Sequence, residues 1–179
     1  MGVGRLGRTP IAVVVHITQG PTLKSTEWSF SSPSSETSAN YVVGRDEMRI
    51  EQYVDEKDRA WHAGLSAELL KDPKQRPIWK LWQPGVNPNV TTIGIENVGF
   101  SVDIKYGKTQ YKKTGPFTDW QYFANAWLIS RAARRWGFPI NEDTVVRHGD
   151  IYLPKKNTCP GPAVDMARII REALELFKA

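Results

Sequence analysis

The chain has 179 residues, of which 40% are apolar and 24% charged, and it contains seven Trp. This length and composition predict a globular protein with a sizeable core and exclude a disordered or low-complexity chain. The 24 Lys and Arg outnumber the 19 Asp and Glu, giving a net charge of +5 that favours polyanions as partners. Nucleic acid, anionic membranes and the bacterial wall all fit this charge, but no helix-turn-helix or RNA-binding motif indicates a requirement for nucleic acid.

Membrane insertion is not indicated by the sequence. The longest apolar run, residues 11–15, is far shorter than the roughly 20 residues needed to cross a bilayer. The basic N-terminus has no apolar segment of the kind found in a secretory signal. We therefore expect synthesis in the cytoplasm without a signal peptide, and a monomer that does not insert into membranes.

The first half of the chain predicts strands with one short helix between them. Residues 11–17 form a β-branched run that is typical of a strand buried on both faces. Residues 20–40, rich in Ser, Thr and Pro, predict a short helix and then a loop. Residues 41–43 and 48–54 predict the two strands of a hairpin. Residues 61–92 carry four prolines and little periodicity, which predicts a long surface excursion and not a core element.

The second half predicts two strands and two helices. Residues 93–98 form a strand in which Gly94 permits close backbone approach. After a Lys-rich connection, Thr118 begins a helix that Gly137 ends, and residues 144–146 form a short strand. The last helix is expected to begin near Pro162. Together these elements predict a single α/β domain with a central mixed β-sheet flanked by helices.

Polar side chains follow three of the predicted strands. His16 and Glu96 come directly after apolar runs, and His148 follows Val145 and Val146 after one arginine. Strand ends in α/β sheets form clefts. Cys159 lies 11 residues beyond His148, in a loop stiffened by prolines. Two imidazoles and one thiolate can hold zinc and leave its fourth position to water, as in catalytic sites. Spacing alone does not establish the metal, because each of these residues could also be a half-buried polar side chain.

Seven segments, taken in order, resemble the type 2 N-acetylmuramoyl-L-alanine amidases. The segments are VVHIT (14–18), SANYVVGRD (38–46), WHAG (61–64), NVTTIGIEN (89–97), PFTDWQY (116–122), VRHGDI (146–151) and CPGP (159–162). That superfamily includes phage amidase endolysins, cytosolic anhydromuropeptide amidases and peptidoglycan recognition proteins. The resemblance implies one catalytic domain over residues 1–179, with no separate cell-wall-binding domain. It also implies hydrolysis of the amide between the lactyl group of N-acetylmuramic acid and L-alanine of peptidoglycan.

The resemblance assigns roles to the residues at the strand ends. It implies that His16, His148 and Cys159 bind one Zn²⁺ per chain. Glu96 would then accept the proton of the water that the zinc activates. Other members use a Tyr for this purpose at the position of Ala39, so here Glu96 is expected to act without a phenol.

The resemblance assigns a catalytic lysine less directly than it assigns the metal ligands and Glu96. The family often has Lys two residues before its third ligand, where this chain has Asn157. The loop before Cys159 is about one residue longer than in close relatives, so Lys156 can occupy the same space and stabilise an oxyanion. The alternative is that Lys155 and Lys156 are both solvated loop charges.

Asn40, Trp61 and His62 are predicted to contact the substrate. The WHAG segment is a structural or substrate-lining loop in the family, so His62 is not expected to bind zinc. Aromatic faces can stack on sugar or peptide, or can pack in the core. Both possibilities apply to Trp28, Trp61, Trp79 and Trp82.

Two other classes of function fit parts of the sequence. A cysteine hydrolase would use Cys159 as nucleophile and His148 or His16 as base, although Pro160 argues against a helix N-terminus that activates the thiol. A peptidoglycan-binding module without catalysis would typically lack the cysteine. Among the enzymes, a muropeptide-recycling amidase is the alternative to a phage endolysin. The basic charge favours the endolysin, acting on the anionic wall after release through a membrane lesion.

Overall fold

The computed structural model describes residues 3–32, 34–66, 68–72, 74 and 77–179, and its centre is strand β2 (Ala12–Ile17). All six residues of β2 are buried, which an uninterrupted β-branched run allows in the middle of a covered sheet. Strand β2 pairs in parallel with β6 (Thr92–Asn97) on one side and with β9 (Val145–Arg147) on the other. The predicted central strand is confirmed, and it brings the ends of three parallel strands to one edge.

A hairpin makes the central sheet mixed. Strand β3 (Tyr41–Val43) pairs antiparallel with β4 (Ile50–Gln52), which confirms the predicted hairpin. It also pairs in parallel with β6. The order across the five strands is β4-β3-β6-β2-β9. Two further pairs are antiparallel: β1 (Val3–Gly4) with β5 (Asp58–Arg59), and β7 (Ile104–Tyr106) with β8 (Thr109–Tyr111).

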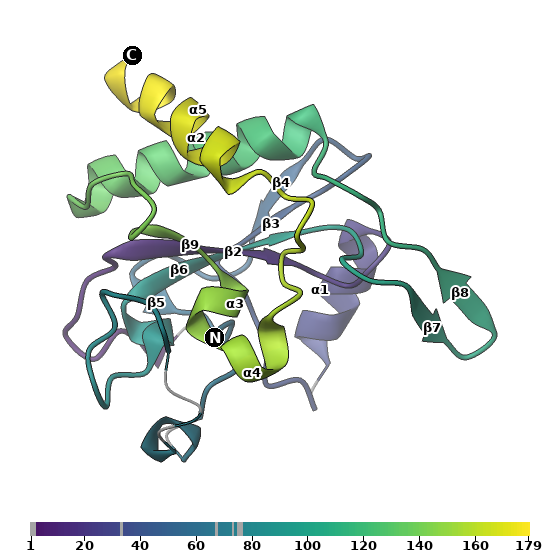
Figure 1. The fold of residues 1–179 in the computed structure, drawn as a ribbon, viewed down its shortest axis with the longest axis horizontal. Helices are drawn as coiled ribbons and strands as arrows, with labels where there is room; N and C mark the ends of the chain where they lie inside the picture. The colour runs from purple at the N-terminus through teal and green to yellow at the C-terminus, as the bar shows by residue number, and fades with distance from the viewer. Residues whose placement is uncertain (1–2, 33, 67, 73, 75–76) are drawn as a thin grey trace.

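Two long helices, α2 (Asp119–Trp136) and α5 (Met166–Lys178), cover one face of the sheet (Figure 1). They pack on the side chains of β2 that point to this face, including Val13 and Val15. Helix α2 begins and ends as the sequence predicts. Thr118 forms a capping box with Gln121, and Gly137 adopts a left-handed conformation with φ of 76°.

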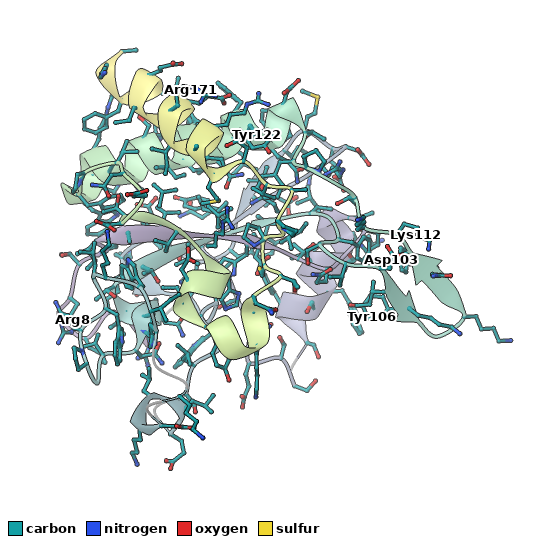
Figure 2. All side chains as sticks on the ribbon, viewed as in Figure 1. Arg8, Asp103, Tyr106, Lys112, Tyr122 and Arg171 are labelled. Atoms are coloured by element: carbon teal, nitrogen blue, oxygen red, sulfur yellow. The ribbon has the colours of Figure 1, made fainter. Side chains whose placement is uncertain are left out.

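Helix α5 begins later than predicted. Its N-cap is Asp165, whose side chain accepts the backbone N–H of Arg168 at 2.9 Å, so the prediction of a start near Pro162 is wrong. An aspartate cap satisfies a free N–H of the first turn, which a proline cannot do. The Asp165 N–H donates to the Tyr122 hydroxyl at 3.0 Å, which ties the start of α5 to α2 (Figure 2).

The opposite face is covered by short helices and by described residues of the proline-rich segment, residues 61–92. The helices are α1 (Leu23–Ser31), α3 (His148–Ile151), α4 (Leu153–Lys156), and the 3-10 helices η1 (Leu69–Lys71) and η3 (Pro88–Val90). Leu65, Leu70 and Trp79 from the proline-rich segment are buried in a cluster with Val14 and Val146. The prediction of a surface excursion without core residues is therefore wrong, because β2 and β9 need apolar cover on both faces.

The Lys-rich connection after β6 forms the β7–β8 hairpin, which projects from the body of the protein (Figure 1). Tyr106 donates a hydrogen bond from its hydroxyl to the carbonyl of Gln19 at 3.2 Å. The ammonium of Lys112 pairs with the Asp103 carboxylate at 2.9 Å near the base of the hairpin (Figure 2). Within the described part of the chain, no helix combines the length and the apolar character that a membrane span requires.

Candidate metal and active site

Three donor side chains converge at the shared edge of the parallel strands. His16 lies on β2, His148 follows β9 as the first residue of α3, and Cys159 lies in the loop after α4. One ligand atom from each lies within 4.8 Å of the other two. The Nδ1 atoms of the two imidazoles are 2.9 Å apart. The three residues predicted to meet at the strand ends therefore lie together.

Hydrogen bonds to the backbone hold Cys159 beside β2. Its thiol sulfur accepts the backbone N–H of Ile17 at 3.4 Å. Its carbonyl accepts the N–H of Gly149 at 3.1 Å, and its own N–H donates to the carbonyl of Lys156 at 2.9 Å. A Cβ atom on Gly149 would lie 3.2 Å from the Lys156 carbonyl oxygen, so a glycine lets this loop pack closely on α3.

The orientation of His148 leaves one ring nitrogen free to bind a metal. Its Nε2 atom lies 3.1 Å from the carbonyl oxygen of Ala63. A carbonyl can only accept, so Nε2 carries the proton and Nδ1 keeps its lone pair toward His16. Burial lowers the pKa of His148 to about 4 and the pKa of His16 well below its usual value. Both rings are therefore neutral near pH 7, as metal binding requires.

The Cys159 thiol is protonated in the absence of a cation. Burial, together with the nearby Glu96 carboxylate, raises the pKa of this thiol to about 12. A thiol with a raised pKa is a weak nucleophile, which argues against the cysteine hydrolase. Coordination to a divalent cation deprotonates a thiol, so the same position suits a metal ligand.

The donor set fits zinc. Two neutral imidazoles and one thiol are nitrogen and sulfur donors, whereas Mg²⁺ and Ca²⁺ select oxygen donors. Three protein ligands are also the usual number in catalytic zinc sites, in which the fourth position is left to water or substrate. His16, His148 and Cys159 would hold the ion.

Glu96 lies next to the three donors without being one of them. Its Oε1 atom is 3.8 Å from Nδ1 of His16, and its side chain is 18% exposed. Its buried Oε2 atom receives no hydrogen bond from the described residues. Burial raises the pKa of Glu96 to about 8, and the charge of Lys156 acts in the opposite direction. A cation bound by the three donors would favour the ionised form of Glu96, whose free oxygen can then accept a proton beside them.

Lys156 is the lysine whose charge acts on this cluster. It is exposed at the end of α4, and its ammonium charge lowers the pKa values of His16, His148 and Cys159. Lys155 instead places its Nζ atom 5.9 Å from the ring of Tyr152. The catalytic role of Lys156 stays a prediction, but this arrangement favours Lys156 over Lys155.

The residues predicted to contact substrate differ in their exposure. Asn40 is fully buried, donates to three backbone carbonyls of residues 54–58 and accepts the Gly94 N–H at 3.1 Å. Its amide is thus used within the fold, and its contact with substrate stays a prediction. Trp61 is 41% exposed, with the Arg59 guanidinium 4.5 Å from its ring centre. Its contact with substrate stays a prediction.

His62 lies behind His16 and is only 6% exposed. Its Nδ1 atom is 3.0 Å from Nε2 of His16, so it contacts a donor residue, and its contact with substrate stays a prediction. The sequence analysis did not single out Asn89, whose side-chain oxygen accepts the N–H groups of both His62 and Ala63. Asn89 is the first residue of the NVTTIGIEN segment, and this position was the signal that could have identified it. Of the other predicted aromatic contacts, Trp79 is buried in the core, Trp82 is partly buried and Trp28 is 77% exposed.

The sequence is similar to that of known N-acetylmuramoyl-L-alanine amidases. A family model described as N-acetylmuramoyl-L-alanine amidase matches residues 6–162. The 1,6-anhydro-N-acetylmuramyl-L-alanine amidase AmpD of Haemophilus influenzae is 32% identical over 133 residues, which are 74% of this chain and 56% of that protein. The N-acetylmuramoyl-L-alanine amidase AmiD of Escherichia coli is 31% identical over 130 residues, 70% of this chain and 38% of that protein. The chain thus spans about half or less of the length of these two relatives.

Solved structures share the fold over nearly the whole chain. A selenomethionine derivative of AmpD superposes with a TM-score of 0.67 at 25% identity, covering 96% of this chain and 89% of that one. Escherichia coli AmiD, solved with anhydro-N-acetylmuramic acid-L-Ala-D-gamma-Glu-L-Lys, has a TM-score of 0.65 at 24% identity, with 93% and 59% covered. With most of its length matched by the family model, this chain belongs to the type 2 N-acetylmuramoyl-L-alanine amidases.

Proposed function

We propose that this protein is a zinc-dependent amidase that hydrolyses the bond between the lactyl group of N-acetylmuramic acid and L-alanine in bacterial peptidoglycan. The observation that carries the proposal is the group of His16, His148 and Cys159 with Glu96 beside it. Membership of the amidase family supports it, as does the muropeptide bound to Escherichia coli AmiD.

The side chains of the site divide the reaction among them. Zinc supplies a Lewis acid that polarises the amide carbonyl and makes water a better nucleophile. Glu96 accepts the proton of the attacking water on a carboxylate oxygen and returns it to the nitrogen of the departing L-alanine. The ammonium of Lys156 stabilises the negative charge that develops on the carbonyl oxygen. Ala39 is a buried alanine and offers no proton-transfer group, so Glu96 acts alone.

Two biological roles are compatible with this reaction: lysis of the intact wall by a phage endolysin, and recycling of soluble muropeptides. We propose the first, with the intact wall as the substrate. The net charge of +5 supports this choice, because a basic protein is attracted to the anionic wall more strongly than to small fragments. The recycling role has support of its own, since one curated relative is named for a 1,6-anhydro substrate. The ratio of kcat/KM on whole walls to that on a soluble anhydromuropeptide distinguishes them.

The reaction is tested by identifying the products of a defined muropeptide. The amidase adds one water and releases a peptide with a free N-terminal L-alanine and a sugar with a free lactyl carboxylate. Mass spectrometry and N-terminal labelling detect both products. A Glu96→Gln variant run in parallel controls for contaminating hydrolases. Cleavage within the glycan or between peptide residues would overturn the proposal, and so would binding without any cleavage, which is expected of a peptidoglycan-binding module.

A further inference from the structure

Two consecutive residues contact the outer nitrogens of both histidine ligands. Nδ1 of His62 lies 3.0 Å from Nε2 of His16, and the carbonyl oxygen of Ala63 lies 3.1 Å from Nε2 of His148. The side-chain oxygen of Asn89 accepts the N–H groups of His62 and Ala63 at 3.1 and 2.8 Å. One short segment, fixed by one amide, therefore supports both imidazoles from behind.

The hydrogen-bond partners of Thr92, His62 and His16 determine which ring nitrogens of the two histidines carry protons. The Thr92 hydroxyl lies 2.8 Å from the carbonyl of Pro88, which can only accept, so the single hydroxyl proton is used there. Its oxygen, 3.1 Å from Nε2 of His62, must then accept a proton from that nitrogen. The ring is buried and already donates from Nε2 to the Thr92 oxygen, so in the neutral imidazole its Nδ1 is an acceptor. Nε2 of His16 therefore carries a proton, and Nδ1 of His16 keeps its lone pair.

The backbone of β6 makes room for the His62 ring. Thr92, Gly94 and Glu96 are alternate residues of this strand and share one of its faces. A Cβ atom on Gly94 would lie 2.5 Å from Cγ of His62, closer than any side chain could tolerate. The glycine thus lets the imidazole lie directly against the strand, next to His16. This close approach accounts for the glycine in the IGIE segment.

We propose that His62 is a positioning residue for zinc binding, which accepts the Nε2 proton of His16 and thereby directs the Nδ1 lone pair of His16 toward the ion. This inference rests on the proposed zinc site. Outer hydrogen bonds of this kind fix the tautomer and the orientation of a metal-binding imidazole. His62 then contributes to the affinity for zinc without touching the ion or the substrate.

The protonation pattern is tested directly by NMR of the zinc-loaded protein with ¹⁵N-labelled histidine. The chain has three histidines, so long-range proton–nitrogen correlations resolve each ring. We expect His62 to be neutral and protonated on Nε2, with Nδ1 as an acceptor, and His16 to be protonated on Nε2. A proton on Nδ1 of His62 would overturn the inference.

The contribution of His62 to zinc binding is tested by measuring the affinity for zinc in competition with a chelator. Thr92→Val removes the acceptor for His62 Nε2 and should weaken zinc binding about 10-fold or more, within the 10- to 100-fold range of such contacts. Thr92→Ser keeps a hydroxyl and should restore the affinity. Thr91→Val is the matched control, because Thr91 is also buried and bonded to the Pro88 carbonyl, but it does not contact His62.

His62→Phe removes the acceptor itself and should weaken zinc binding about 10- to 100-fold. Thermal unfolding of the zinc-free variants separates this effect from a loss of fold, and the Thr92 pair decides the question if His62→Phe does not fold. Equal zinc affinity in folded wild-type, Thr92→Val and Thr91→Val proteins would overturn the inference while leaving the zinc site intact. A wild-type protein that binds no zinc would instead overturn the proposed function.

Discussion

His16 and Glu96 lie directly opposite each other on the parallel strands β2 and β6, with 3.8 Å between His16 Nδ1 and Glu96 Oε1. Register partners point to the same face of a sheet, so the pairing that builds the core also sets a proposed metal ligand beside a carboxylate. A slip of one residue would turn one of the two to the other face. The distance between the proposed ligand and the proposed base is thus fixed by backbone pairing and not by a loop.

This relationship gives a prediction for Glu96→Gln. The glutamine keeps the size of the side chain but cannot take a proton, so the chemical step should slow by about 10²- to 10⁴-fold, the usual contribution of a positioned general base. Zinc content and the free energy of unfolding should change little. Single-turnover kinetics and metal analysis are the measurements. Loss of zinc would make the carboxylate a ligand, and near-normal turnover would show that the base lies elsewhere.

Lys156→Ala should lower kcat on a small soluble muropeptide by about tenfold or more. A buried, preorganised oxyanion donor contributes 10²- to 10³-fold, and the exposure of Lys156 reduces that contribution. Lys155→Ala is the matched control, because its ammonium lies toward the Tyr152 ring. Equal rates for the two variants on the soluble substrate would remove Lys156 from the chemistry. A loss seen only on whole walls would assign Lys156 to surface attraction.

Salt should affect the two kinds of substrate differently. Lysis of whole walls should fall as ionic strength rises, while cleavage of a soluble muropeptide hardly changes, because only the wall presents a dense anionic surface. Turbidity and product release, measured over the same salt series, give the two responses. The same salt dependence on both substrates would contradict the electrostatic account of wall binding.

The β7–β8 hairpin concentrates part of this charge on one projecting element. Lys105 and Lys108 lie on the hairpin, Lys113 follows it, and all three are exposed. Replacing the three with Gln should reduce both wall lysis at low salt and its salt dependence. The charge-matched control replaces three exposed lysines from elsewhere on the surface, namely Lys24, Lys57 and Lys178. If the two triple variants behave alike, total charge and not the hairpin governs wall binding.

Stability should depend on Glu56, a carboxylate that is 2% exposed. It accepts hydrogen bonds from the Tyr41 hydroxyl at 2.7 Å, from Arg135 at 2.8 Å and from the Trp136 indole at 2.7 Å. Glu56→Ala leaves the buried Tyr41 hydroxyl and the partly buried Trp136 indole without this acceptor and should lower the free energy of unfolding by about 3 kcal/mol. Urea denaturation measures the change, with exposed Glu36→Ala as control. A change below about 1 kcal/mol would show that these donors find other partners.

The regular elements and the metal donors could be predicted because their signals are local. The β-branched run of β2 and the capping box at Thr118 each specify their element within a few residues. Parallel strands end at a common edge, so a polar residue after each run predicts a shared site. This pattern predicted that His16 and His148 lie together, and they do so although 132 residues separate them in the sequence.

The errors concern packing between distant segments. The sequence around His62 does not show that its ring is buried against Gly94, 32 residues later. Likewise, the prolines near Trp79 indicate a loop but not that this loop covers Val14. The start of α5 offered two local signals, Pro162 and Asp165, and the hydrogen bond of the aspartate decides between them.

The central claim is tested most directly by titrating zinc into metal-free protein while hydrolysis of a defined muropeptide is measured. Three ligands from one chain predict that activity is absent without metal and rises until about one equivalent of zinc is bound. Cys159→Ser should need far more zinc to reach its plateau, because a neutral hydroxyl replaces a thiolate. Full activity in the metal-free protein, unchanged by added zinc and abolished by a thiol-blocking reagent, would contradict the account and assign catalysis to the cysteine.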